Sequence, residues 1–120
     1  MQSKSKILLI EDNAEMRENL TEILELAEYD VKSAEDGLIG IQYARQFRPD
    51  IILCDIMMPN LDGFGVLKII QQDESLKHLP FIFLTAKSEK EDFRKGMNLG
   101  AEDYLVKPFE DSDLLQIVEN

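Results

Sequence analysis

Residues 49–63, Pro-Asp-Ile-Ile-Leu-Cys-Asp-Ile-Met-Met-Pro-Asn-Leu-Asp-Gly, decide the fold of this chain. Within them, the apolar run Ile51–Cys54 stands directly in front of the acidic Asp55. A run that is apolar at every position, and not only at every second one, predicts a strand buried on both faces of a parallel sheet. After Asp62-Gly63 the apolar residues recur at helical spacing. The stretch therefore predicts a strand that ends in a carboxylate, a loop and a helix.

The same alternation of strand and helix extends outward in both directions. Ile7–Ile10 and Phe81–Leu84 are again continuously apolar, and Tyr29–Ser33 and Tyr104–Val106 are further strand candidates. Five β–α units in succession predict a doubly wound α/β fold, with a five-stranded parallel sheet and helices on both faces. The expected helices are Ala14–Glu28 with Asn13 as N-cap, Gly37–Phe47, a helix after Gly63, Glu89–Leu99 with the left-handed Gly100 beyond it, and a helix from Glu110 to the end.

Composition indicates a single domain spanning residues 1–120, as an independent protein or as part of a longer regulator or hybrid kinase. Apolar residues make up 44% and charged residues 31%, which suits a folded soluble chain and not a disordered one. The net charge of -11 disfavours direct binding to nucleic acid. The apolar run Ile7–Ile10 is far too short to span a membrane. With Cys54 as its single cysteine, which cannot form an internal disulfide, we expect a cytoplasmic protein.

Chemically active side chains follow the predicted strands. Glu11 and Asp12 follow the first strand, Asp55 the third, Thr85 the fourth and Lys107 the fifth. Open parallel sheets gather their functional groups at the carboxyl ends of the strands, so these residues should meet at one edge. Three carboxylates at one edge repel one another unless a cation lies between them.

Mg²⁺ suits this set of side chains, with Mn²⁺ as an alternative. Mg²⁺ binds through one or two carboxylates, keeps several waters and takes a phosphate oxygen to complete its octahedron. Lys107 can pair with Asp55 or with an incoming phosphoryl oxygen, and the hydroxyl of Thr85 can donate to that oxygen. The pattern therefore predicts phosphoryl transfer to an aspartate nucleophile.

Four stretches of this sequence resemble the receiver domain of two-component response regulators. The matching residues are Ile-Leu-Leu-Ile-Glu-Asp-Asn at 7–13, the stretch 49–63 quoted above, Leu-Thr-Ala at 84–86 and Gly-Ala-Glu-Asp-Tyr-Leu-Val-Lys-Pro-Phe at 100–109. The resemblance covers essentially the whole chain. It implies a flavodoxin-like strand order of 2-1-3-4-5, with phosphate carried on Asp55.

The resemblance also implies a role for each residue around the cation. Asp12 should bind the metal directly, Glu11 should hold it through water, and Asp55 and the backbone carbonyl of Met57 should complete the protein ligands. The residues Met57 and Lys87 resemble those that set the lifetime of the phosphoryl group. Neither side chain is suited to orienting an attacking water, so we expect slow self-hydrolysis.

A second set of roles concerns the signal. The resemblance implies that Thr85 and Lys107 bind the phosphoryl group and that the side chain of Tyr104 follows the position of Thr85. The Lys107–Pro108 bond resembles the family's cis peptide. The expected result is a remodelled face formed by the fourth helix, fifth strand and fifth helix.

The expected partners are a sensor histidine kinase or phosphotransfer protein and a downstream target, with no membrane. Homodimerisation on phosphorylation is left open, and the chain would catalyse only its own phosphorylation and dephosphorylation. One alternative is a binding module that never reacts. A flavodoxin-like electron carrier is a weaker one, because Glu11-Asp12-Asn13 would repel a flavin phosphate. A phosphatase is disfavoured because Met57 cannot transfer protons.

Overall fold

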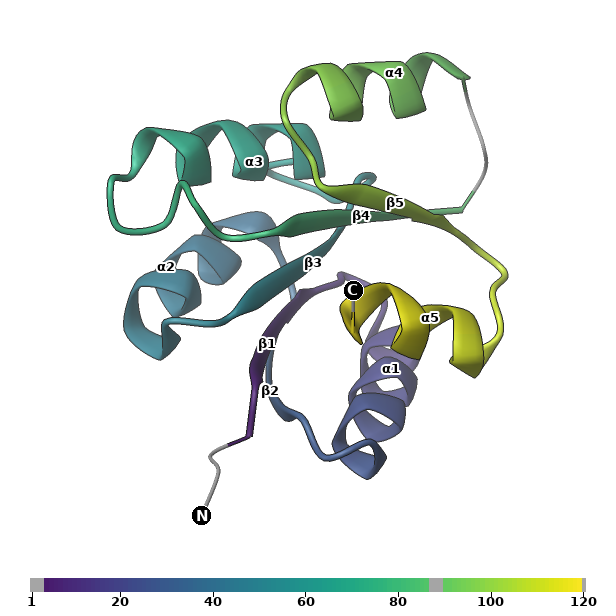
Figure 1. Ribbon diagram of the computed structural model, residues 1–120. Coiled ribbons are helices and arrows are strands. Elements are labelled where there is room, and N and C mark those ends of the chain that lie inside the picture. Colours follow the sequence, from purple (N-terminus) through teal and green to yellow (C-terminus); the bar gives the residue numbers. More distant parts are fainter. Residues whose placement is uncertain (1–3, 87–89, 120) are drawn as a thin grey trace.

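The chain folds into one parallel sheet between two layers of helices (Figure 1). The structure, a computed structural model, describes residues 4–86 and 90–119, with the backbone alone for residues 90–93. The elements in chain order are β1 Lys6–Ile10, α1 Ala14–Leu26, β2 Asp30–Ala34, α2 Gly37–Phe47, β3 Ile51–Asp55, α3 Gly63–Gln72, β4 Phe81–Thr85, α4 Lys90–Asn98, β5 Asp103–Val106 and α5 Asp111–Glu119. Each predicted strand and helix is therefore present.

The five strands lie in the order β2-β1-β3-β4-β5, and every neighbouring pair is parallel. This confirms the doubly wound, flavodoxin-like α/β fold. The three continuously apolar strands, β1, β3 and β4, occupy the middle of the sheet and are almost wholly buried. β2 alternates between exposed and half-buried residues, as suits a strand at the edge.

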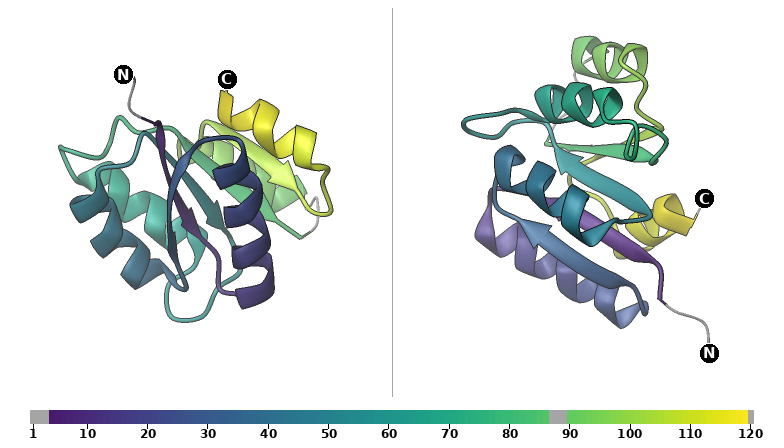
Figure 2. Two further views of the ribbon diagram at one scale, coloured as in Figure 1. Left: turned by 90° about the horizontal axis from the view of Figure 1, so that it is seen from below. Right: turned by 90° about the vertical axis from the view of Figure 1, so that its left-hand side faces the viewer.

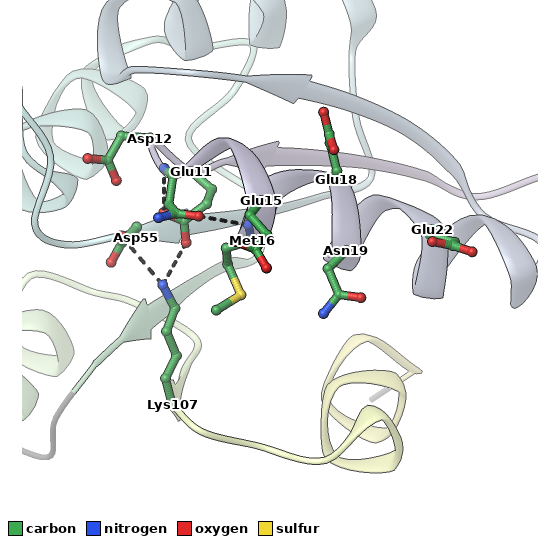
Figure 3. A pocket seen from close by; sticks show the side chains of 10 residues that line it. Glu11, Asp12, Glu15, Met16, Glu18, Asn19, Glu22, Asp55 and Lys107 are labelled. Carbon is green, nitrogen blue, oxygen red and sulfur yellow. Dashed lines mark hydrogen bonds and ion pairs between the residues drawn. The ribbon is translucent and has the colours of Figure 1, made fainter.

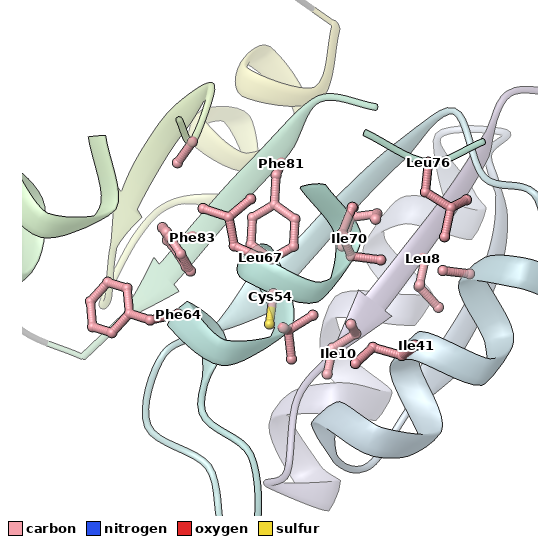
Figure 4. Packing of buried hydrophobic residues seen from close by; sticks show 14 of the residues in the cluster. Leu8, Ile10, Ile41, Cys54, Phe64, Leu67, Ile70, Leu76, Phe81 and Phe83 are labelled. Atoms are coloured by element: carbon pink, nitrogen blue, oxygen red, sulfur yellow. The ribbon is translucent and has the colours of Figure 1, made fainter. Parts of the chain in front are cut away.

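Two hydrophobic clusters form the core, one on each face of the sheet. Side chains alternate between faces along a strand, so neighbours such as Leu8 and Leu9 belong to different clusters. The cluster that contains Leu8 packs beneath α2 and α3, and Figure 4 shows Phe81 and Phe83 on the same side. The cluster that contains Leu9 packs against α1 and α5, through Leu20 and other apolar side chains. Both faces of the sheet are thereby covered by helices.

Helix α4 contacts α3 and β4 through several described side chains. Its Gly96 lies directly on the ring of Phe83, where an added Cβ would come within 2.9 Å of two ring carbons. The ammonium of Lys95 lies 4.5 Å from the centroid of the Phe64 ring. Just beyond the helix, Gln71 of α3 donates a hydrogen bond to the carbonyl of Leu99. These contacts place α4 over α3 and β4.

The predicted boundaries shift by one or two residues. The second strand is Asp30–Ala34 and not Tyr29–Ser33, and α1 ends at Leu26 and not at Glu28. Asn13 is the N-cap of α1, since its side chain accepts from the backbone N–H of Met16 at 2.8 Å. α4 begins at Lys90, and the predicted start at Glu89 lies outside the described residues.

Two further expectations concern Gly100 and the membrane. Gly100 has φ = 102° just after α4, as predicted for a left-handed position. Among the described residues, no helix combines the length and the apolar character needed to cross a bilayer.

Candidate functional site

The register of the sheet brings the predicted acidic residues together. Ile10 of β1 lies opposite Cys54 of β3, so Glu11 and Asp55 leave the sheet side by side. Thr85 of β4 lies opposite Val106 of β5, which places Lys107 at the same edge. The backbone N–H of Lys107 donates to the carbonyl of Thr85 at 2.6 Å. Parallel pairing alone therefore gathers residues that are far apart in sequence.

Lys107 contacts two carboxylates, as Figure 3 shows. Its Nζ lies 2.6 Å from Oε1 of Glu11 and 3.6 Å from Oδ2 of Asp55. The other carboxylate oxygen of Glu11 accepts from the backbone N–H of Asn13 at 3.2 Å. Glu11 is only 1% exposed, so these two donors compensate a carboxylate that has lost its water. The closest contact of Lys107 is therefore Glu11, and Asp55 is a longer second partner.

Asp12 completes the acidic set, and its backbone and Lys107 lower its pKa by less than other effects raise it. Partial burial is the main cause that raises the pKa of Asp12 above its ordinary value, and the neighbouring Glu11 raises it further. Glu11, Asp12 and Asp55 each place one carboxylate oxygen within 4.8 Å of the others. The ionised form of Asp12 is thus disfavoured, and a positive charge among the three carboxylates would relieve it.

This acidic trio opens into a cavity of about 670 Å³ that continues along α1. The lining residues are Glu11, Asp12, Asn13, Glu15, Met16, Glu18, Asn19, Glu22, Asp55 and Lys107. Figure 3 shows the side chains of α1 leading away from the trio. We did not predict the α1 residues as part of the site, although their spacing of three and four places them on one helical face.

Arg17 is a site residue that the sequence pattern did not indicate. Its Nη1 donates to the backbone carbonyl of Glu11 at 2.8 Å, and that of Asp12 lies 3.4 Å away. The contact pins the backbone of the acidic pair to α1 while leaving both carboxylates free of the guanidinium. Arg17 follows Asn13 by one helical turn, so a contact with the preceding loop is geometrically possible. The sequence pattern, however, does not distinguish Arg17 from a solvated helix residue.

Gly63 explains how α3 can begin so close to Asp55. A Cβ on Gly63 would lie 2.5 Å from the backbone carbonyl oxygen of Asp55 and 2.9 Å from Cα of Ile56. The backbone N–H of Gly63 also donates to the carbonyl of Ile56 at 2.9 Å. Only glycine permits this close approach. The start of α3 therefore packs directly on the backbone of Asp55.

The other predicted residues that the structure describes do not line this cavity. Thr85 is 4% exposed at the end of β4, and Tyr104 is half-buried and packs against the cluster on the α2–α3 side. Met57, in the loop after β3, is 74% exposed. The Lys107–Pro108 bond is cis, which confirms that expectation. Lys87 lies outside the described residues.

The residues present fit a hard divalent cation. All candidate ligands are carboxylate oxygens, without a cysteine or histidine in the trio. Mg²⁺ prefers oxygen ligands, and two or three carboxylates beside one lysine leave net negative charge for it to neutralise. Glu11, Asp12 and Asp55 are therefore the side chains that would hold it.

A doubly wound sheet with three acids and a lysine at its carboxyl edge is the arrangement expected of a signalling receiver. The comparison of sequences makes the assignment specific. The family model of the response regulator receiver domain matches residues 7–119, and the chain belongs to that family. Members of this family are signalling proteins of two-component systems, not conventional enzymes, and they bind Mg²⁺ in an acidic pocket.

Related proteins include both long regulators and short ones. The chain is 39% identical over 110 residues to the DNA-binding dual master transcriptional regulator RpaA of Synechocystis, a match that covers 92% of this chain and 46% of RpaA. It is 36% identical over 114 residues to Protein PilH of Pseudomonas aeruginosa, covering 95% of this chain and 94% of PilH. The chain thus spans about half the length of RpaA and nearly all of PilH.

Solved structures agree with the family. The chemotaxis protein CheY4 of Vibrio cholerae superposes with a TM-score of 0.92 at 31% identity, covering 97% of each chain. The receiver domain of a signal transduction histidine kinase from Syntrophus aciditrophicus superposes with a TM-score of 0.88 at 30% identity, covering 96% of this chain and 87% of the other.

Proposed function

We propose that this chain is a phosphorylation-operated switch in which Asp55 accepts a phosphoryl group in a Mg²⁺-dependent reaction. The observation that carries the proposal is the group formed by Glu11, Asp12 and Asp55 with Lys107, whose ammonium lies within 4 Å of two of the three carboxylates. The phosphodonor is the phosphohistidine of a sensor kinase or phosphotransfer protein, or a small acyl phosphate. The expected charge neutralisation requires all four side chains.

In the transfer, a carboxylate oxygen of Asp55 attacks phosphorus and the bond from phosphorus to the donor nitrogen or oxygen breaks. The bonding pair leaves with the donor, so no proton or electron is taken from the protein. Lys107 turns from Glu11 and Asp55 towards the new phosphoryl oxygens, and Thr85 donates its hydroxyl to them. A bound Mg²⁺ supplies the positive charge that offsets the repulsion between the carboxylate and the phosphoryl group. Asp12, Asp55 and the backbone carbonyl of Met57 would hold the ion directly, and Glu11 would hold it through water.

The signal follows from a shift in an existing equilibrium. Phosphorylation adds roughly −1.5 to −2 charges at one point, which draws Thr85 inward. Tyr104, next to the space that Thr85 leaves, follows it. The face formed by α4, β5 and α5 changes shape and binds a different partner. The described contacts of α4 include Gly96 against Phe83 and Lys95 over Phe64, and a movement of α4 would change both.

Several features of the whole protein are proposals of the same kind. We place it in the cytoplasm, where its kinase partners act, and assign residues 1–120 to one receiver domain. DNA binding by a longer protein containing this chain would require a further domain, as the length of RpaA allows. Self-hydrolysis should be slow, because the apolar side chain of Met57 cannot orient a water.

The test is phosphorylation by acetyl phosphate, followed by intact mass. The wild-type chain should gain the mass of one phosphoryl group only with Mg²⁺ present, and Asp55→Asn should gain none. Asp30→Asn is the matched control, because Asp30 is exposed at the opposite end of the edge strand. A wild-type chain that stays unmodified would favour the binding module. A purified protein carrying a yellow flavin would favour the electron carrier.

A second measurement separates the acceptor from the switch. Thr85→Ala should still be phosphorylated on Asp55, but the amide shifts of α4, β5 and α5 should no longer change on phosphorylation. Wild-type shifts in Thr85→Ala would show that the hydroxyl does not couple the two events.

A further inference from the structure

A groove crosses the edge of the sheet opposite the acidic trio. It lies where the amino ends of β3, β4 and β5 meet the last turn of α5, and its volume is about 420 Å³. Figure 2 shows that β1 begins and α5 ends at this edge. Apolar side chains line much of it, namely Ile51, Pro80, Ile82, Ile117 and Val118. Most of them are only half-buried, so the folded chain leaves apolar surface open to water here.

Carboxylates surround this apolar floor. Asp50, Glu102, Asp103 and Glu119 line the groove, all four are exposed, and none of the lining residues that the structure describes is a lysine or arginine. Tyr29 forms part of the wall, and its pKa is raised, first by burial and then by the charge of Glu119. The groove thus combines apolar and aromatic surface with an excess of negative charge among the lining residues that the structure describes.

Of the two lysines that flank the groove residue Ser5 in sequence, Lys6 is engaged elsewhere and Lys4 is exposed. The Nζ of Lys6 donates to the carbonyl of Phe47 at 3.3 Å and lies 5.2 Å from the centroid of its ring. Only the backbone N–H of Lys6 reaches the groove residue Asp50, donating to Oδ2 at 2.7 Å. The ammonium of Lys6 therefore does not neutralise the rim.

We propose that this groove docks a segment of a partner protein that carries at least two lysine or arginine side chains with an apolar residue between them. The apolar floor would bury the apolar residue, and the four carboxylates would pair with the cations. Exposed ion pairs are individually weak, so a ligand with several positive charges is favoured over a single small cation. Nucleic acids and anionic membranes carry the same sign of charge as the rim and are disfavoured.

The groove is independent of the acidic trio, because the two lie at opposite ends of the strands. The partner would bind whether or not Asp55 carries a phosphoryl group. This separates the inference from the proposed switch, since loss of phosphorylation in Asp55→Asn should leave docking intact.

A labelled peptide tests the proposal. The probe is fluorescein-tagged Arg-Leu-Lys-Leu-Arg-Leu-Lys, measured by anisotropy with saturating Mg²⁺, so that the acidic trio is occupied. Glu102→Gln combined with Glu119→Gln should weaken binding by about fivefold, the sum of two exposed ion pairs. The matched control is Glu25→Gln combined with Glu35→Gln, which removes the same charge from exposed positions elsewhere and should leave binding within about twofold of the wild type.

Two further measurements show where the peptide binds and whether its apolar side chains contribute to binding. Amide shifts should move at Ile51, Ile82 and Val118 and stay unchanged at Asp12. A peptide with serine in place of leucine should bind clearly more weakly, because the apolar floor would then be unused. Equal weakening by both double variants, equal binding of the serine peptide, shifts confined to the acidic trio, or no binding at all would each overturn the proposal.

Discussion

The ammonium of Lys107 interacts unequally with the three acids of the site, and most weakly with Asp12. The ammonium contacts Glu11 at 2.6 Å and Asp55 at 3.6 Å, whereas burial and Glu11 raise the pKa of Asp12. A raised pKa means that ionised Asp12 is less favourable in the folded chain than in the unfolded one. Its charge therefore lowers the free energy of unfolding at every pH above the raised value.

Asp12→Asn should consequently stabilise the metal-free protein. At pH 7 with EDTA we expect a rise of a few tenths of a kcal/mol in the free energy of unfolding, measured by urea titration. The gain should shrink as the pH falls through the raised pKa and vanish below the ordinary value of 3.8, where the carboxyl is protonated in both states. With Mg²⁺ the ranking should reverse, since ligand binding to the folded state stabilises the wild type more than the variant. A destabilised variant in EDTA would contradict this reading.

Arg17 should act as a positioning residue for the same trio. Arg17→Met removes the donor to the carbonyls of Glu11 and Asp12, so we expect Mg²⁺ affinity to fall by about tenfold, as for other groups that orient metal ligands. The measurement is calorimetric titration with Mg²⁺. Arg94→Met, which removes a charge from an exposed position on α4, is the control and should bind Mg²⁺ as the wild type does.

A melting curve separates positioning from simple destabilisation. If Arg17→Met lost thermal stability in EDTA yet bound Mg²⁺ normally, the guanidinium would be a structural contact only.

The sequence indicated the acids and Lys107 but not Arg17, for a physical reason. Each acid and the lysine directly follows a strand, and parallel pairing carries all strand ends to one edge. Arg17 reaches the site through a long side chain whose rotamer decides the contact. The preference of Lys107 for Glu11 over Asp55 likewise depends on distances of about an ångström, which spacing along the chain does not encode.

At the scale of elements, the end of α1 shows where local patterns mislead. The apolar stripe continues to Ala27, so the helix was expected to reach Glu28. Instead the N–H of Tyr29 donates to the carbonyl of Leu24, and that of Glu28 to Glu25, which together form a Schellman motif. Glu28 occupies the left-handed position with φ = 71°, where glycine is usual, so the sequence carried no signal for the stop.

Glu28→Gly should therefore stabilise the chain. A non-glycine residue in the left-handed region costs about 1–2 kcal/mol, and glycine avoids this strain. Part of that gain is lost because glycine has more conformational entropy in the unfolded chain. We expect a net gain of about 0.5–1 kcal/mol in chemical unfolding. Glu25→Gly, within the helical part of α1, is the control and should lose about 1 kcal/mol. Loss of stability in Glu28→Gly would show that its side chain makes a contact worth more than the strain.

At the scale of the whole molecule, we expect the free energy needed to open an element to increase with the burial of its residues. The central strands β1, β3 and β4 are buried almost throughout, whereas four of the five α4 residues whose side chains the structure describes, at positions 94, 95, 97 and 98, are exposed. Amides of the central strands should exchange with solvent only through global unfolding, and those of α4 through local opening. Native-state hydrogen exchange at increasing urea measures this directly. Protection of α4 equal to that of β3 would contradict it.

The global fold was accessible from sequence because three continuously apolar runs can be buried only in the middle of a parallel sheet. The groove at the opposite edge was not. Ile51, Glu102 and Val118 belong to separate elements, none is part of a motif, and only the packing of α5 on the sheet brings them together.

The buried Cys54 allows unfolding of this chain to be followed by thiol reactivity. Its thiol is fully buried, hydrogen-bonds to the carbonyl of Asp55 at 3.2 Å and has a pKa raised well above its ordinary value, first by burial and then by Asp55. Alkylating reagents act on the thiolate, so the native chain should be inert to them until β3 is released. A fluorophore or spin label can therefore be attached at any engineered surface cysteine without first replacing Cys54. At high temperature, the rate at which Cys54 itself is alkylated reports complete unfolding.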